Sequence, residues 1–282
     1  MFYISLPYFY ENYQFNQFFK NYIEDCRNNK LDKLVADFNI EYAYGSFPWS
    51  YWNGGINNHR GSAVLANEIH SFFIQTNIPI RIDVSNTYLE EINYYDIHEN
   101  AILRIVNGTN TVYEISDLNL MAYISERNLN NKFIISNNAQ LLHPFNTNIL
   151  NVFQERPEIN FINVGYNIDI DITQIQDKNK LEVSIGYCQN CSAEKCLHCI
   201  DEEQRNIYNF SKTSFFINCP NGCKYIDYYD KIKLYLKQGI KHFKIVTEPS
   251  NLTAFNISII KSFIKPEYQG ECINEYLRQI SK

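Results

Sequence analysis

The sequence predicts a fold of the α/β class, a (β/α) barrel that is either complete or distorted. Short apolar runs rich in β-branched residues alternate with helical or polar stretches along the 282 residues, a pattern typical of parallel strands joined by helices. About seven or eight such units in a chain of this length fit a barrel. An open doubly wound sheet is the alternative, but the chain has neither a G-x-G-x-x-G nor a Walker A motif to indicate nucleotide binding.

The expected strands are short runs of apolar, β-branched and aromatic residues. They lie at residues 2–7, 39–44, 78–84, 102–106, 111–115, 132–136, 160–164, 180–185 and 241–246. The first expected helix, at residues 10–28, is indicated by apolar residues at helical spacing, namely Phe15, Phe18, Phe19, Tyr22 and Ile23. The other helices are expected at 62–75, 117–128 and 226–238, and Gly239 is expected to cap the last of them in a left-handed conformation.

Six of the eight cysteines fall within 36 positions. They are Cys188, Cys191, Cys196, Cys199, Cys219 and Cys223. Thiolates at this density usually hold a metal or an iron–sulfur cluster, because soft sulfur ligands select zinc, iron–sulfur clusters or Cu(I). A [4Fe–4S] cluster needs four of them, which leaves two spare, and His198 is an alternative ligand within the cluster.

Other interpretations of the cysteines stay open. A structural zinc on four thiolates suits the two C-x2-C pairs, although the four-residue gap between them is shorter than in ordinary zinc ribbons. A disulfide framework fits the even count, but a chain this long can bury a core without staples and begins with no basic segment typical of secretion. Unligated thiols are the remaining interpretation.

We expect residues 1–282 to form one barrel-like domain with a cysteine-rich insertion at 187–224. The insertion follows the strand expected at 180–185. In a barrel it therefore begins at the carboxyl ends of the strands, where barrel enzymes have their active sites.

Composition excludes some classes of protein. A net charge of −6 and a pI near 5.6 are not typical of a general nucleic-acid binder. No apolar run approaches the length of a transmembrane helix. We expect a soluble, cytoplasmic protein, and the reducing cytosol also suits thiolate ligands.

Two groups of residues outside the cysteine segment are candidates for substrate binding. Trp49 and Trp52, followed by Arg60, lie in an aromatic loop that is expected to overhang the barrel and to stack on a ring-bearing substrate. The alternative is a loop packed for its own stability, with Arg60 only solvated. The second group is Asn137, Gln140 and His143, which follow the strand expected at 132–136 and could hydrogen-bond a substrate or simply be solvated.

Five stretches, in order along the chain, resemble stretches of peptidase family U-thirty-two. They are residues 40–45, 114–120, 136–140, 181–188 and 236–245. The last is similar to the family's L-x-x-a-G-v-x-x-l-K-I pattern. The resemblance implies a (β/α) barrel with an oxygen-sensitive [4Fe–4S] cluster on four cysteines. It also implies hydroxylation of quinone precursors or RNA bases without dioxygen, or the peptidase activity attributed to other members.

The resemblance implies a set of ligands. Cys188 matches the first, Cys196 or Cys199 the third, and Cys223 or Cys219 the fourth, while Cys191 is nearest to the second. The chain departs from the family at the R-E pair after the sixth strand, which is Tyr166–Asn167 here, and at the K-I-E-G-R ending, which is residues 244–248.

Two functional hypotheses follow. The first is an iron–sulfur barrel enzyme of redox or hydroxylation type acting on a small molecule, an RNA or a peptide. The second is a non-catalytic binding protein in which zinc staples the cysteine segment and the barrel recognises a peptide or protein partner. A peptidase is a third possibility that only the resemblance supports.

Overall fold

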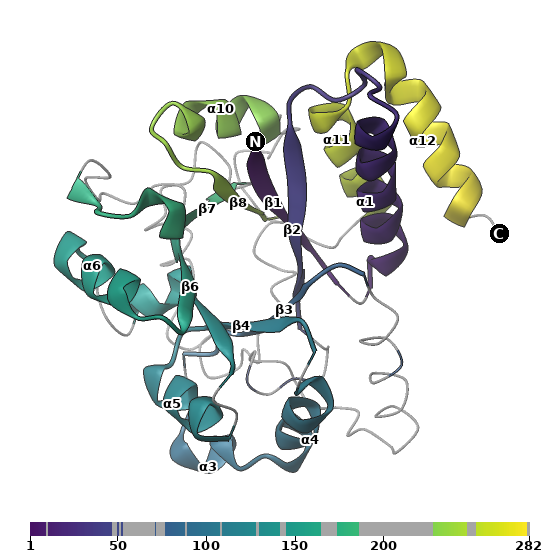
Figure 1. The fold of residues 1–282 in the computed structure, drawn as a ribbon. Coiled ribbons are helices and arrows are strands. Elements are labelled where there is room, and N and C mark those ends of the chain that lie inside the picture. The colour runs from purple at the N-terminus through teal and green to yellow at the C-terminus, as the bar shows by residue number, and fades with distance from the viewer. Residues whose placement is uncertain are drawn as a thin grey trace, which may run out of the picture.

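The computed structural model describes residues 1–9, 11–46, 50, 52, 71, 77–87, 89–107, 109–127, 130–141, 145–164, 174–185, 228–246 and 252–280. In this part of the chain, parallel strands close into a barrel in sequence order (Figure 1). The strands are β1 (Phe2–Pro7), β2 (Phe38–Gly45), β3 (Ile80–Val84), β4 (Thr111–Ile115), β5 (Lys132–Ile135), β6 (Ile159–Val164), β7 (Leu181–Ile185) and β8 (His242–Ile245). Strand β1 pairs with both β2 and β8, which closes the ring and confirms the predicted barrel.

Helices lie around the outside of the barrel (Figure 1). The described ones are α1 (Tyr13–Asn28), α3 (Glu91–Tyr94), α4 (Ile97–Val106), α5 (Leu118–Arg127), α6 (Thr147–Glu155), α10 (Tyr228–Leu236), α11 (Leu252–Phe263) and α12 (Pro266–Ile280), with 3-10 turns η1 (Asn137–Leu141) and η3 (Lys178–Lys180). Helices α1 and α11 both pack against α12, so the first and last described helices lie together on one side of the barrel. None of the described helices has the length and apolar character to span a membrane.

Several local predictions are confirmed. The five apolar residues that predict α1 are all buried against the barrel. Gly239 ends the turn after α10 with φ of +87°, a left-handed conformation that glycine adopts without strain from a Cβ atom. The expected helix at 62–75 lies outside the described residues except for Ser71, which is helical.

One expected strand, at residues 102–106, is wrong. These residues form the last turns of α4, with Ile102, Leu103 and Val106 buried at the spacing of a helix face. A run of five residues of which four are apolar does not distinguish a strand from a buried helix segment, and here the run continues a helix that begins at Ile97. Helices α6, α11 and α12 were not predicted.

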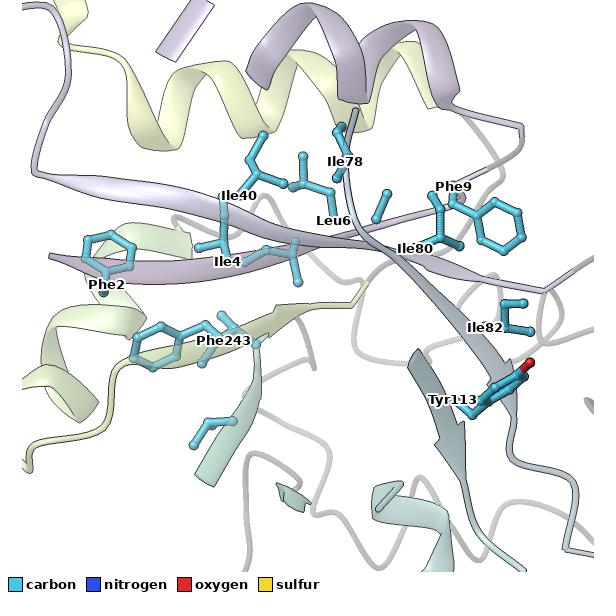
Figure 2. Packing of buried hydrophobic residues seen from close by; sticks show 14 of the residues in the cluster. Phe2, Ile4, Leu6, Phe9, Ile40, Ile78, Ile80, Ile82, Tyr113 and Phe243 are labelled. Atoms are coloured by element: carbon cyan, nitrogen blue, oxygen red, sulfur yellow. The ribbon is translucent and has the colours of Figure 1, made fainter. Parts of the chain in front are cut away.

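The strands bury two separate apolar layers, because successive side chains point to opposite faces. Outward-facing residues such as Phe2, Ile4, Leu6 and Phe243 pack with the helices in the main core (Figure 2). Inside the barrel a smaller apolar cluster consists of Tyr42, Val112, Ile134 and Phe161.

The amino-terminal half of the barrel interior is also closed by an aromatic stack. The His242 ring lies between Tyr3 and Phe161, with ring centroids 5.0 and 4.4 Å away. Its Nδ1 lies 2.7 Å from Oε2 of Glu41. Side chains therefore fill the barrel interior at its amino-terminal end. Two residues further along the strands, the inward-facing side chains change from apolar and aromatic to polar and charged.

Candidate functional site

The next inward-facing positions along the strands are polar or charged. They are Ser5 on β1, Arg81 on β3, Glu114 on β4, Asn163 on β6, Glu182 on β7 and Lys244 on β8. Arg81 and Glu182 are the second residues of their five-residue strands, and the other four lie at the centre or in the carboxyl-terminal part of theirs. We refer to these six residues as the charged layer. Branched apolar residues usually fill this space in such barrels, so the charged layer is the feature that needs a functional explanation.

Arg81 and Glu182 form the base of the charged layer, and both residues are fully buried, with exposed fractions of 0%. Nη1 of Arg81 donates to Oε1 and Oε2 of Glu182 at 2.7 and 2.6 Å. Two further donors reach the same carboxylate: Ser5 Oγ at 3.1 Å and Asn163 Nδ2 at 2.7 Å. Asn163 is itself oriented by Ser184, whose hydroxyl donates to Asn163 Oδ1 at 2.9 Å.

Glu114 joins this base to Lys244. Nε of Arg81 lies 3.1 Å from Glu114 Oε2, although its N–H does not point at an acceptor. Nζ of Lys244 donates to both carboxylate oxygens of Glu114, at 2.6 Å to Oε1. The Lys244 ammonium also lies 4.3 Å from the centre of the Tyr44 ring, within the range of a cation–π contact. Lys244 remains 8% exposed and is the least buried member of the charged layer.

Burial and pairing act in opposite directions on these groups. Burial alone would raise the pKa of Glu182, but the charges of Arg81 and Lys244 and the bonds from Arg81 and Asn163 outweigh it and hold that pKa below its ordinary value. Burial alone would lower the pKa of Arg81, but Glu114 and Glu182 raise it. For Glu182 and Arg81, the pairing outweighs burial and favours the ionised form.

A buried ionic network of this kind seldom stabilises a fold more than well-packed apolar residues would. Removing one partner nevertheless costs about 3–5 kcal/mol, because a charge is left buried and unpaired. Since apolar residues would fill the same space at lower cost, we identify the charged layer as the candidate functional site.

Serine side chains continue the polar surface toward the carboxyl ends of the strands. Ser136, directly after β5, donates to Glu114 Oε1 at 3.1 Å. Ser85, directly after β3, bonds through both its N–H and its hydroxyl to Asp83. Ser116 directly follows β4, and no hydrogen-bond partner of its hydroxyl is found among the described residues.

The structure places only some of the predicted site residues. All six clustered cysteines, His198, Trp49, Arg60 and His143 lie outside the described residues. Asn137 begins η1 two residues after the end of β5, at the carboxyl end of the strand as expected, and is buried. Gln140 also lies in η1, but its side chain is outside the described part.

Trp52 corrects an expectation. It was predicted to lie in an exposed loop, but only 2% of it is accessible and it belongs to the main core. Its indole Nε1 donates to the backbone carbonyl of Asn93 at 3.0 Å, and its ring meets the Tyr123 ring edge to face. A buried indole has no free face for a substrate ring, so for Trp52 the packed alternative holds in this structure.

None of the four charged residues of the layer was predicted as a site residue, although three lie in stretches that resemble the family. The signal that could have identified them is a charge in the middle of a short apolar run, as in Ile80–Val84 or Leu181–Ile185. Strands of a parallel barrel are covered on both faces, so such a charge must be buried inside the barrel.

The two described cysteines do not resemble metal ligands. Cys26 on α1 and Cys272 on α12 are buried, and burial raises the pKa of both, to about 12 for Cys272. In the described part of the chain, no group of three or more histidine, cysteine or acidic residues could hold a metal ion. A cluster or zinc ion on cysteine would therefore have to be held by the thiols of residues 188–223.

In comparisons with known proteins, no family model and no curated protein matches the chain. The resemblance to peptidase family U-thirty-two stays a prediction.

Proposed function

We propose that the protein is an iron–sulfur barrel enzyme of redox or hydroxylation type, in which the charged layer contributes to the substrate site. The observation that carries the proposal is the charged layer itself. A non-catalytic barrel gains little from four ionised groups in its interior, whereas an enzyme uses fixed charges to orient a substrate and to stabilise developing charge.

Chain connectivity supports a cofactor near this layer. Glu182 and Ser184 lie on β7, and Cys188 follows the last residue of that strand, Ile185, by three positions. An extended chain of three residues reaches at most about 11 Å. Chain connectivity therefore keeps Cys188 near the carboxyl end of β7. Ser85, Ser116 and Ser136 follow their strands at the same end of the barrel.

The donor set fits a [4Fe–4S] cluster. Six thiols are available in residues 188–223, and four are required. When bound, such a cluster supplies one-electron chemistry that the protein's own side chains lack. Within the charged layer, Glu182 accepts hydrogen bonds from Arg81, and Nε of Arg81 lies 3.1 Å from Glu114. Lys244 is the more exposed of the two cations. The charged layer would bind and orient the substrate. Thiolate ligation of this kind suits a reducing, cytoplasmic setting.

The test is metal analysis of anaerobically purified protein. The wild-type chain should carry about four irons and matching sulfide, with a visible absorption that dithionite bleaches reversibly. Cys188→Ser should lose this iron. The matched control is Cys26→Ala, which removes a buried thiol of α1 and should retain the full iron content.

A colourless protein with one zinc and no iron would overturn the proposal and support the zinc-stapled binding protein instead. Iron that persists in Cys188→Ser and in the corresponding variants of the other five clustered cysteines would equally overturn it.

A further inference from the structure

Both carboxylate oxygens of Glu182 already accept two hydrogen bonds. Oε1 of Glu182 accepts from Ser5 and Arg81, and Oε2 accepts from Arg81 and Asn163. A carboxylate offers about four lone-pair positions, so Glu182 is saturated.

Glu114 is nearly filled. Its Oε1 accepts from Ser136 and Lys244. Its Oε2 accepts from Lys244 and lies 3.1 Å from Nε of Arg81. Glu182 therefore has no acceptor position left for a ligand, and Glu114 has at most one, on Oε2.

The donors are not all used. Arg81 Nη2 is fully buried and finds no acceptor among the described residues. The same holds for the hydroxyl of Ser116, which is 0% exposed within the described part of the chain. Ser116 lies two residues beyond Glu114, so strand alternation places it facing inward directly after β4, the strand that pairs with β3, further toward the carboxyl ends than Arg81.

We propose that the charged layer recognises an uncharged acceptor oxygen of the substrate, of the carbonyl type, through Arg81 Nη2 and the Ser116 hydroxyl. Buried donors without acceptors are unfavourable, and a ligand oxygen would satisfy them. The proposal rests on the proposed function in taking the barrel interior as the substrate site.

Charge distinguishes among the possible acceptors. Arg81 and Lys244 are already paired with Glu114 and Glu182, and Asp83 on β3 is a further buried carboxylate, so a carboxylate ligand would add negative charge to a buried set that has no spare cation. An amine would bring further donors and a positive charge to a place where the unpaired groups are themselves donors. A neutral carbonyl meets the unpaired donors without disturbing this balance.

The test is a set of three small probes titrated by ligand-observed NMR against the whole protein. Acetophenone is a neutral acceptor, benzoate an anionic acceptor and benzylamine a cationic donor, and the shared ring provides the signal. Acetophenone should bind most tightly of the three. In the infrared spectrum, the carbonyl stretch of bound acetophenone should shift to lower frequency. Benzoate should bind more weakly and benzylamine weakest of the three.

Two serine variants form a matched pair. Ser116→Ala removes a buried hydroxyl that has no described partner, so the Tm should stay the same or rise, while acetophenone affinity falls about five-fold. Ser136→Ala removes a hydroxyl that already bonds to Glu114, so the Tm should fall while acetophenone affinity changes less than about two-fold. Arg81→Lys keeps the cation but removes Nη2 and should abolish detectable binding.

Equal acetophenone affinity in the wild-type protein and in Ser116→Ala would overturn the proposal, as would tighter binding of benzylamine. No binding of acetophenone to the wild-type protein would also overturn it and would assign the two donors to buried water. Iron content is measured on the same preparations. Carbonyl binding in a zinc-loaded protein would retain this inference and refute the proposed function, and an iron-loaded protein without carbonyl binding would do the reverse.

Discussion

Arg81 on β3 and Glu182 on β7 are joined across the barrel by hydrogen bonds of 2.6 and 2.7 Å, both completely buried. The two strands are four positions apart in a closed ring of eight, so the pair spans the interior. It fixes the distance between opposite walls of the barrel at the level of the charged layer. The remaining contacts of the layer are arranged around it.

Glu182→Gln should destabilise the fold by about 3 kcal/mol, because Arg81 would lose its strongest partner while remaining buried and charged. Urea unfolding measures this change. The control is Glu24→Gln on α1, where the ion pair with Lys20 is partly exposed and should contribute less than about 0.5 kcal/mol. Equal effects of the two substitutions would mean that the buried pair is not coupled to folding.

The same carboxylate predicts a dependence of stability on pH. The pKa of Glu182 is below its ordinary value of 4.5 in the folded protein. Its contribution is therefore fully present above that value and is lost as the pH falls through the lower folded pKa. Between about pH 5 and pH 2, the free energy of unfolding should fall more steeply for the wild-type protein than for Glu182→Gln. Parallel curves would contradict the assignment.

The barrel was predictable from the sequence because strand and helix patterns alternate over most of the chain. Residues 102–106 were predicted as a strand but end a helix, because the apolar residues of a short segment do not show whether the residues before it are helical. The charged layer was missed for a different reason. A single charge in a strand is ambiguous until pairing and closure decide that Arg81, Glu114, Glu182 and Lys244 face one another.

Trp52 illustrates the same limit. Its neighbours in sequence, including Pro48 and Gly54, are typical of a loop. Its burial comes from Asn93 and Tyr123, which are distant in sequence. Residue type and spacing alone could not place it in the core.

Trp52→Ala should therefore destabilise the protein by about 3–5 kcal/mol, the range for truncating a large buried aromatic side chain. The decrease in Tm on thermal unfolding measures this effect. Ile97→Ala is the control, because Ile97 on α4 is 81% exposed and should change stability by less than about 0.5 kcal/mol. A Trp52→Ala protein with unchanged Tm would restore the interpretation of an exposed loop.

Cys26 and Cys272 should be unreactive in the native protein. Burial raises the pKa of both thiols, so little thiolate forms at pH 8, and their exposed fractions leave almost no access to a reagent. Iodoacetamide labelling followed by peptide mass spectrometry should modify these two cysteines only after urea is added. Rapid native labelling of either would show that the α1–α12 contact opens readily.

Glu114 and Lys244 should behave as one energetic unit. Lys244→Met removes one of the two cations that neutralise Glu114, and Glu114→Gln leaves the Lys244 ammonium with a neutral partner beside Tyr44. Each single substitution should cost about 2–4 kcal/mol. The double variant should lose about 1–3 kcal/mol less stability than the sum of the two single losses, because it leaves neither a carboxylate nor an ammonium without its partner.

The matched comparison is the exposed pair of Lys265 and Asp32, for which the same cycle should give no measurable coupling energy. Urea unfolding of each set of four proteins supplies both coupling energies. Additive effects of Glu114→Gln and Lys244→Met would mean that each residue acts through other contacts. Arg81, which lies 3.1 Å from Glu114, would then be the dominant partner of that carboxylate.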